Sequence, residues 1–260
     1  MAALGTTLRF DLLPSTQDEA IRRVREGASP GLCIVALRQH RGRGRLDHRW
    51  DSPEGGLYLS LALPEPKFEP GLVPIGVGAV LAASLSERYG FAAVLKWPND
   101  VLVPSAGRPA PKLAGVLVDR VLSPAFGTAV VVGVGINAAS VRSAFPPDLA
   151  PRVAILSELA GRTVPPEEVE PVARAAIEGT VERLASATGR TALWQQCRGV
   201  LYGVGRPVRV DGHRAGILRD LAEDGALLVE GPQGRTEIRA GDVEVEEVGG
   251  TGRSDGVGRS

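Results

Sequence analysis

The sequence predicts an α+β fold in which a large domain built on a mixed sheet is followed by a small β-barrel. Apolar strands succeed one another between residues 93 and 134 with few crossover helices, which is typical of a mixed sheet. From residue 203 onward, short strands recur about every eight to twelve residues, as in a barrel or sandwich. We expect domains at 1–200 and 203–248, and a disordered Gly/Ser/Arg-rich tail at 249–260.

The first elements are predicted from hydrophobic periodicity and helix-end signals. Residues 8–13 form a short apolar strand, and Thr16–Glu19 fit a capping box that opens a helix ending at Gly27. Residues 32–37 form a continuous apolar strand, and leucines alternate with other residues over 57–63 in a second strand. A polar, glycine-rich loop separates these two strands.

The rest of the large domain combines two long helices with four strands. Residues 72–89 are helical because apolar residues recur at four-residue intervals, and a long amphipathic helix over 169–184 is expected to close the domain. The strands between the helices are predicted at 93–96, 101–103, 113–121 and 128–134. Those of the barrel are predicted at 207–210, 214–218, 226–230, 235–239 and 243–245.

Composition places the chain among globular proteins of the cytoplasm. Its 260 residues are 43% hydrophobic, and 30 basic residues balance 30 acidic ones, so no global charge attracts nucleic acid or anionic lipid. Cys33 and Cys197 match no metal spacing and are expected to be reduced, buried and not catalytic. Neither an export signal nor an apolar membrane span is found, so we expect a cytoplasmic protein.

The most unusual segment is the loop from Gln39 to Gly56, hereafter the Arg/Gly loop. It holds Arg41, Arg43, Arg45 and Arg49, and Gly42 and Gly44 alternate with the first three. Glycines let backbone N–H groups approach an anion, and guanidinium groups match phosphate and carboxylate oxygens. An exposed loop or an RNA-contacting segment is the alternative, but a position between two apolar strands favours an anion site.

Further polar groups stand where predicted strands and helices begin or end. Lys96-Trp97-Pro98-Asn99-Asp100 follows a strand, Lys112 opens another beside the small Ala114 and Gly115, and Ser15-Thr16-Gln17 opens a helix. Each has an ordinary structural explanation: a Pro-Asn-Asp turn, a solvated lysine and an N-cap. Gly133-Val134-Gly135-Ile136-Asn137 fits a nicotinamide fingerprint, but we reject that interpretation because Pro146 and Pro147 follow instead of a helix.

In their order along the chain, these five motifs resemble those of the biotin–protein ligase family. They are Ser15-Thr16-Gln17, Gly42-Arg43-Gly44-Arg45 with Trp50, Lys96-Trp97-Pro98-Asn99-Asp100, Lys112-Leu113-Ala114-Gly115 and Gly133-Val134-Gly135-Ile136-Asn137. The resemblance spans residues 8–245. It implies a biotin- and ATP-binding catalytic domain with the class II synthetase/biotin–lipoate ligase fold, followed by an SH3-like domain.

The resemblance also implies an activity and a set of ligand-binding residues. Biotin and ATP, with Mg²⁺, would form biotinyl-5′-AMP, and biotin would pass to a lysine of a biotin carboxyl carrier protein. Lys112 and Arg45 would be the catalytic residues. The resemblance assigns biotin to Ser15, Thr16, Gln17, Gln39, Arg43, Gly44, Arg45, Lys112 and Gly115, and the nucleotide to Trp50, Lys96, Asn99, Asp100 and Asn137, with no protein-bound metal.

Other expectations follow from the same resemblance, and two alternatives stay open. With fourteen residues before Ser15 we expect the monofunctional type without an N-terminal DNA-binding domain, as a monomer or homodimer that binds neither DNA nor membrane. Where the family's loop continues with Gly and Arg, this chain has Asp47 and His48. The alternatives are a lipoate–protein ligase and, from a different class, an RNA-binding module.

Overall fold

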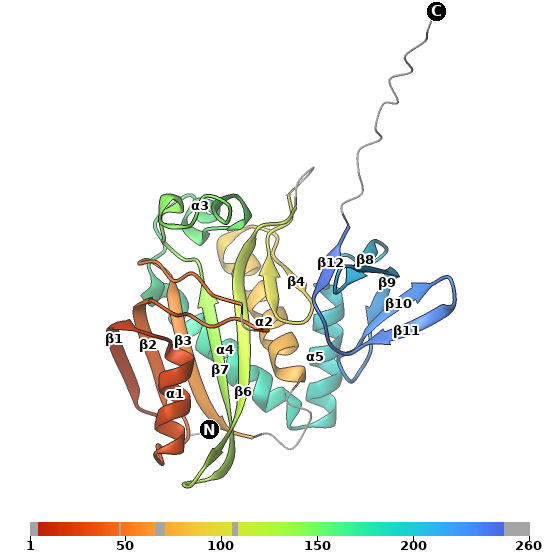
Figure 1. Cartoon of the computed structure of the whole chain (residues 1–260). Coiled ribbons are helices and arrows are strands. Elements are labelled where there is room, and N and C mark those ends of the chain that lie inside the picture. Colours follow the sequence, from red (N-terminus) through yellow and green to blue (C-terminus); the bar gives the residue numbers. More distant parts are fainter. Residues whose placement is uncertain (1–4, 47, 66–70, 106–108, 247–260) are drawn as a thin grey trace, which may run out of the picture.

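The computed structural model describes residues 5–46, 48–65, 71–105 and 109–246, and the tail predicted at 249–260 lies outside them. A mixed sheet of seven strands in the order β1-β2-β3-β7-β6-β5-β4 forms the large domain (Figure 1). Only β1 and β2 pair in parallel within it. The strands are β1 Thr7–Leu13, β2 Cys33–Gln39, β3 Leu57–Pro64, β4 Val94–Lys96, β5 Asp100–Leu102, β6 Lys112–Ser123 and β7 Gly127–Ile136.

Helices cover both faces of this sheet, so its central strands are buried on both sides. The helix α1 (Thr16–Arg25) packs Ala20 and Val24 on one face, and α2 (Leu72–Tyr89) and α4 (Pro166–Leu184) lie on the other. Residues 57–63 of β3 are all buried, including Tyr58 and Ser60 between the leucines. The leucines of β3 therefore lie on one buried face of the sheet, and the residues that alternate with them lie on the other buried face.

The predicted fold class and the strand positions are confirmed, but one helix start is wrong. We expected a capping box from Thr16 to Glu19, whereas the N-cap is Ser15, whose hydroxyl accepts from Asp18 N at 3.3 Å. Glu19 binds Arg22 and Arg23 instead of reaching back to the cap. The Thr16 hydroxyl is unavailable for capping because it lies 3.0 Å from Ser60 Oγ.

The expectation that the helix over 169–184 closes the large domain is also wrong. It is followed by α5 (Ala187–Gly199), which packs on α2 and α4, and it is preceded by the short α3 (Leu156–Ala160). The periodicity of α5 is weak because only Leu193 and Cys197 are buried in it. No helix of the described ranges is both long and apolar enough to cross a membrane.

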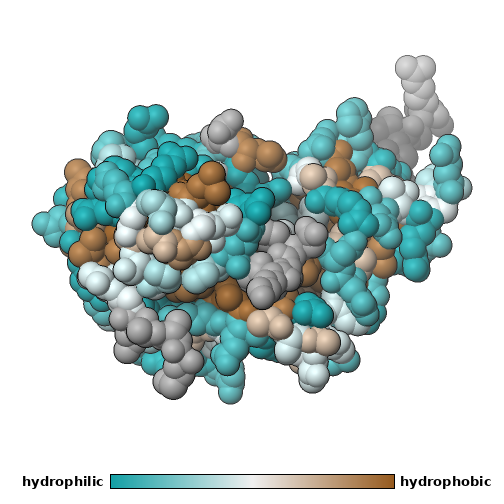
Figure 2. All heavy atoms as spheres, turned by 90° about the horizontal axis from the view of Figure 1, so that it is seen from below, coloured by the Kyte–Doolittle hydropathy of each residue, from teal (hydrophilic) through white to brown (hydrophobic). Residues whose placement is uncertain are grey.

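The C-terminal sheet is antiparallel, in the order β11-β10-β9-β8-β12, and is consistent with an SH3-like domain. It lies beside α5 and β4 (Figure 1). Seen from below, the surface of the molecule has apolar areas interspersed with polar ones (Figure 2). Two indole N–H groups join the C-terminal sheet to the large domain: Trp97 donates to Gly225 O at 2.8 Å and Trp194 to Leu221 O at 3.0 Å. Its strands are β8 Pro207–Val210, β9 His213–Leu221, β10 Leu227–Gly231, β11 Gly234–Ile238 and β12 Val243–Val245.

Because β3 is enclosed on both faces, truncating one of its leucines should be costly. Leu61→Ala, at a fully buried position, is expected to lower the free energy of unfolding by about 2–5 kcal/mol. Leu122→Ala, on β6 with the residue 77% exposed, should change it by less than about 0.5 kcal/mol. Urea unfolding followed by circular dichroism measures both, and equal losses would contradict the two-sided burial of β3.

Candidate active site

A single cavity on the sheet collects nearly all residues that the sequence singled out. The Arg/Gly loop lies along one side of it, and residues of β3, β6 and β7 form its floor. Asn137 is the exception and does not line it. The predicted residues that line it are Ser15, Thr16, Gln17, Gln39, Arg43, Gly44, Arg45, Trp50, Lys96, Asn99, Asp100, Lys112 and Gly115.

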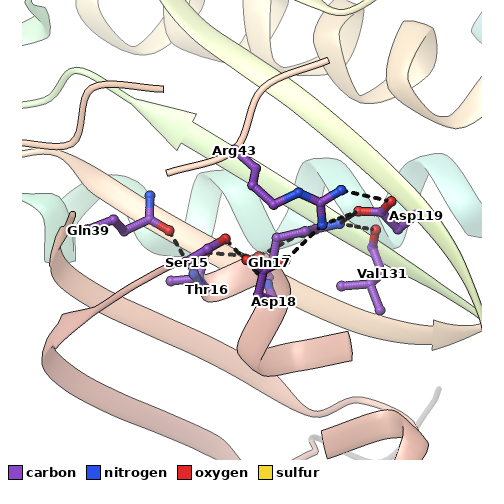
Figure 3. A network of polar contacts seen from close by, with 9 residues as sticks. Ser15, Thr16, Gln17, Asp18, Gln39, Arg43, Asp119 and Val131 are labelled. Atoms are coloured by element: carbon purple, nitrogen blue, oxygen red, sulfur yellow. Dashed lines mark hydrogen bonds and ion pairs between the residues drawn. The ribbon is translucent and has the colours of Figure 1, made fainter. Parts of the chain in front are cut away.

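One end of the cavity is built from neutral hydrogen-bonding groups. Gln17 Nε2 donates to Val131 O and to Asp119 Oδ2, each at 2.9 Å, and Gln17 Oε1 accepts from Ser60 Oγ at 2.9 Å. Gln39 Oε1 accepts from Thr16 N at 2.7 Å. These groups come from α1, β2, β3, β6 and β7, so the sheet register and the helix start together fix the geometry of this end (Figure 3).

Arg43 joins the Arg/Gly loop to this neutral end. Its Nη1 lies 3.0 Å from Asp18 Oδ1 and 3.3 Å from Asp119 Oδ2 (Figure 3). Burial lowers the pKa of the Arg43 guanidinium, but the carboxylates of Asp119 and Asp18 outweigh it and hold the pKa above its ordinary value. Arg43 is thus a charge already balanced by two carboxylates.

Trp50 forms a wall of the cavity because the sheet below it has no side chains in the way. A Cβ at Gly135 would lie 2.7 Å from the Trp50 indole, and one at Gly115 would lie 3.0 Å from it. Lys112 Nζ lies 5.0 Å from the centre of a Trp50 ring, a cation–π contact. The small residue at Gly115, expected to admit a ligand, makes room for this indole.

The opposite end of the cavity carries charge. Lys112 Nζ lies 2.7 Å from Asp100 Oδ1, and Arg45 Nη1 donates to Asn99 Oδ1 at 3.1 Å. The Asn99 amide also donates to Val116 O at 2.9 Å, so Asn99 joins Arg45 to the strand that Lys112 begins. Two cations from distant parts of the chain therefore meet at the turn formed by Asn99 and Asp100.

The C-terminal domain contributes one residue to this charged end. Asp242 lines the cavity, and its Oδ1 lies 3.8 Å from Lys96 Nζ. Its backbone is held by the turn at Asp211, since Asp242 N donates to Asp211 Oδ1 at 2.8 Å. Lys96 and Trp97 both contact the second domain. These contacts give a role to two residues that a Pro-Asn-Asp turn does not explain.

Asn137 lies behind the cavity wall. Its Nδ2 donates to Lys112 O at 3.1 Å and its backbone N–H to Leu113 O at 3.0 Å, so it supports the backbone that carries Lys112. Its Oδ1 is buried with no hydrogen-bond partner among the residues described. The loop after Ile136, where β7 ends, confirms that the glycines of β7 do not open a helix.

Sequence reasoning missed several residues of the site. Ser60 and Asp119 read as ordinary strand residues, and Asp242 lies in a different domain. A signal was present for Gly133 and Gly135, because alternate glycines in an apolar strand indicate a close approach from the same face. A Cβ at Gly133 would lie 2.5 Å from Gln17 Oε1. Tyr58, His48 and Arg49 also line the cavity, and Asp47 lies outside the described residues.

The two cysteines lie apart from this site. Burial raises the pKa of the Cys33 thiol to about 11 and that of Cys197 to about 12, and neither residue lines the cavity. The expectation that both are buried is confirmed. The described cavity lining therefore offers no thiol to a ligand.

The fold and the cavity define a small-molecule-binding α+β domain, in which a neutral recognition end adjoins a cationic end suited to phosphate or carboxylate. The family model for the biotin/lipoate A/B protein ligase family matches residues 10–137. A biotin–[acetyl-CoA-carboxylase] ligase of Paracoccus denitrificans is 30% identical over 243 residues, which cover 88% of this chain and 96% of the relative. The chain belongs to this family.

Solved structures give the same result for the fold. The biotin protein ligase from Aquifex aeolicus in complex with biotin and ATP is 29% identical with a TM-score of 0.77, covering 93% of this chain and 98% of that one. Among the relatives found by sequence, a bifunctional ligase/repressor of Bacillus subtilis is 28% identical over 244 residues, which are 90% of this chain and 72% of the relative.

Raised thiol pKa values predict that the native protein resists thiol reagents. At pH 8 the thiolate fraction should be about 0.1% for Cys33 and about 0.01% for Cys197, against roughly a quarter for a free cysteine. Ellman's reagent should therefore react slowly with the folded protein and release two equivalents in guanidinium. Rapid reaction of either thiol in the folded state would show that its burial is wrong.

Proposed function

We propose that the protein is a biotin–protein ligase, which forms biotinyl-5′-AMP from biotin and ATP and transfers biotin to a lysine of a biotin carboxyl carrier protein. The observation that carries the proposal is the joining of two unlike ends in one cavity. The neutral end around Thr16 suits the uncharged ring system of biotin, and the end with Arg45 and Lys112 suits its carboxylate beside a phosphate.

The first half reaction joins two anions, so its main obstacle is charge repulsion. The biotin carboxylate attacks the α-phosphate, a new C–O–P bond forms, and pyrophosphate leaves with the electrons of the broken P–O bond. Lys112 and Arg45 neutralise the charge that develops at that phosphate, and no nucleophilic side chain is required. Asp100 holds Lys112 until the anions arrive, because their contact is an ion pair at 2.7 Å.

Arg43 has a different role from Arg45 under this proposal. Its guanidinium is paired with Asp18 and Asp119, so it anchors the Arg/Gly loop beside the ring-binding residues. These two of the loop's arginines thus differ: Arg43 is fixed by carboxylates, whereas the Arg45 guanidinium donates, among the residues described, to the neutral amide of Asn99. Arg45 is the better placed of the two to exchange its partner for a ligand anion.

The nucleotide is assigned to the end formed by Trp50, Lys96, Asn99 and Asp100, with Asn137 supporting Lys112 from behind. Among the described residues, no three His, Cys, Asp or Glu side chains could hold a metal ion together. The carboxylate of Asp100 at this end fits Mg²⁺, which binds proteins through one or two carboxylates and keeps waters and phosphates as its other ligands. Asp100 would face an ion that the nucleotide brings with it, and this ion would neutralise phosphate charge.

The second half reaction requires a neutral lysine amine from the carrier and exclusion of water. The amine attacks the mixed anhydride carbonyl, an amide forms, and AMP leaves. The anhydride is reactive enough without a further catalyst, so the enzyme mainly holds and shields it. The Trp50 indole and the Arg/Gly loop line the side of the cavity where this shielding is needed.

The direct test is to incubate the protein with biotin, Mg·ATP and a purified carrier domain, and to weigh the carrier by mass spectrometry. We expect the mass of one biotinyl group on the carrier and none without ATP. A parallel reaction with lipoate and its acceptor domain tests the main alternative, since the family includes lipoate ligases. Lipoyl transfer without biotinyl transfer would show that the protein is a lipoate–protein ligase. RNA binding that needs no ATP, with neither transfer, would favour an RNA-binding module.

Lys112→Ala should slow adenylate formation by about a hundredfold or more while weakening ATP binding much less, because the charge it meets is greatest in the transition state. Biotin-dependent pyrophosphate exchange and ATP titration measure the two effects. Arg120→Ala removes a cation from the same strand at an exposed position and serves as the control. Exchange at the parental rate in Lys112→Ala would remove Lys112 from the reaction.

Arg45→Gly should separate the two half reactions. Loss of one charge-assisted hydrogen bond, worth roughly 1.5–3 kcal/mol, is expected to speed adenylate escape by about one to two powers of ten while Lys112 still supports activation. Free adenylate acylates accessible lysines, so albumin in the reaction should become biotinylated in proportion to its concentration.

The matched control is Arg41→Gly, which makes the same change in the same loop at a residue that does not line the cavity. It should label the carrier alone. If Arg45→Gly labels the carrier but leaves albumin as unlabelled as the parent does, then Arg45 does not retain the intermediate.

A further inference from the structure

The orientation of the Gln17 side-chain amide is fixed by what surrounds it. Its nitrogen faces two groups that only accept hydrogen bonds, the carboxylate of Asp119 and the carbonyl of Val131. Turning the amide round would place Oε1 against both of these oxygens. Gln17 therefore presents Oε1, an obligate acceptor, to Ser60.

This orientation sets the direction of the next hydrogen bonds. Ser60 donates to Gln17 Oε1 at 2.9 Å, and a hydroxyl has a single hydrogen, so Ser60 Oγ must accept from Thr16 Oγ1 at 3.0 Å. Both hydroxyls are enclosed, since Ser60 is 0% and Thr16 is 4% exposed. Thr16 has then used its hydrogen and offers the cavity only lone pairs, which accept an N–H of a ligand.

Asp119 begins this chain of hydrogen bonds, and it also binds Arg43 of the Arg/Gly loop. Its Oδ2 accepts from Gln17 and lies 3.3 Å from Arg43 Nη1, while its Oδ1 accepts from Arg43 Nη2 at 3.4 Å. Both carboxylate oxygens thus face donors. An asparagine at 119 would have to turn its NH₂ group toward either Arg43 or Gln17, and would meet a donor at one of them.

We propose that Asp119 is a positioning residue for biotin, which orients the chain from Gln17 through Ser60 so that Thr16 accepts a ring N–H of the ligand, and which anchors Arg43 beside it. The assignment rests on the proposed function. Asp119 acts through other residues and does not line the cavity. Its side-chain partners among the residues described, Gln17 and Arg43, lie at the ring-binding end, so its effect is expected on biotin more than on the nucleotide.

The test is pyrophosphate exchange by the whole chain, with KM measured separately for biotin and for ATP. Asp119→Asn should raise the KM for biotin at least about tenfold, and leave that for ATP and kcat within about threefold, because one polarised hydrogen-bond chain is lost. Asp119→Glu, which keeps two accepting oxygens, should recover most of the loss. A structural defect would raise both constants or lower kcat, and the glutamate would not correct it.

Asp18→Asn is the matched control. It removes the same charge from the other carboxylate that pairs with Arg43, but the Gln17 side-chain amide bonds to Asp119, Val131 and Ser60 and not to the Asp18 carboxylate among the residues described. Its KM for biotin should rise less than that of Asp119→Asn, because the Arg43 anchor is weakened while the hydrogen-bond chain from Gln17 through Ser60 keeps its direction. Ser60→Ala interrupts the same chain without changing charge, should raise the KM for biotin several-fold, and decides the question if Asp119→Asn does not fold.

The outcomes separate this assignment from the proposed function. A parent protein without biotin-dependent exchange overturns the function and the assignment together. An active parent overturns the assignment alone in three cases: an unchanged biotin KM in Asp119→Asn or Ser60→Ala, an equal rise for biotin and ATP, or an equal rise in Asp18→Asn and Asp119→Asn.

Discussion

A polar cavity set into an apolar sheet depends on one constraint: buried hydrogen-bonding groups need partners, because an unpaired one costs about 1–3 kcal/mol. Gln17, Thr16 and Ser60 are all almost fully enclosed, and each bonds to another or to a backbone group. Meeting that constraint removes their rotational freedom. The same bonds that stabilise the buried cluster therefore decide which groups it can offer a ligand.

The sheet makes room for this arrangement by omitting side chains. Gly133 admits the Gln17 amide and Gly135 admits the Trp50 indole, so two alternate positions of β7 receive two different walls of the cavity. Neighbouring residues Val132 and Val134 point the other way and stay in the core. Strand periodicity thus lets one segment contribute to the core and to the cavity without compromise to either.

The fold was largely predictable because it follows from hydrophobic patterns of ordinary strength. The bounds of α2 agreed fully, since apolar residues run through the helix and Gly90 ends it in a left-handed conformation. The helix α5 was missed because little of it is buried. Motifs located the cavity, but strand pairing and domain contact bring Ser60 and Asp242 into its lining and Asp119 against Gln17 and Arg43 behind it. Such contacts leave no local mark in a single sequence.

The contacts of the Lys96–Asp100 turn explain why the small domain belongs to the site. Trp97 is buried and donates to Gly225 O in the turn between β9 and β10, and Lys96 faces Asp242. Asn99 of the same turn accepts from Arg45 of the Arg/Gly loop. A turn held from both sides has little freedom to shift. The second domain therefore acts on the charged end through the backbone of this turn as well as through the carboxylate that it places there. Separating the domains would release the turn, and with it the placement of Arg45 relative to Lys112 on which the proposed charge neutralisation depends.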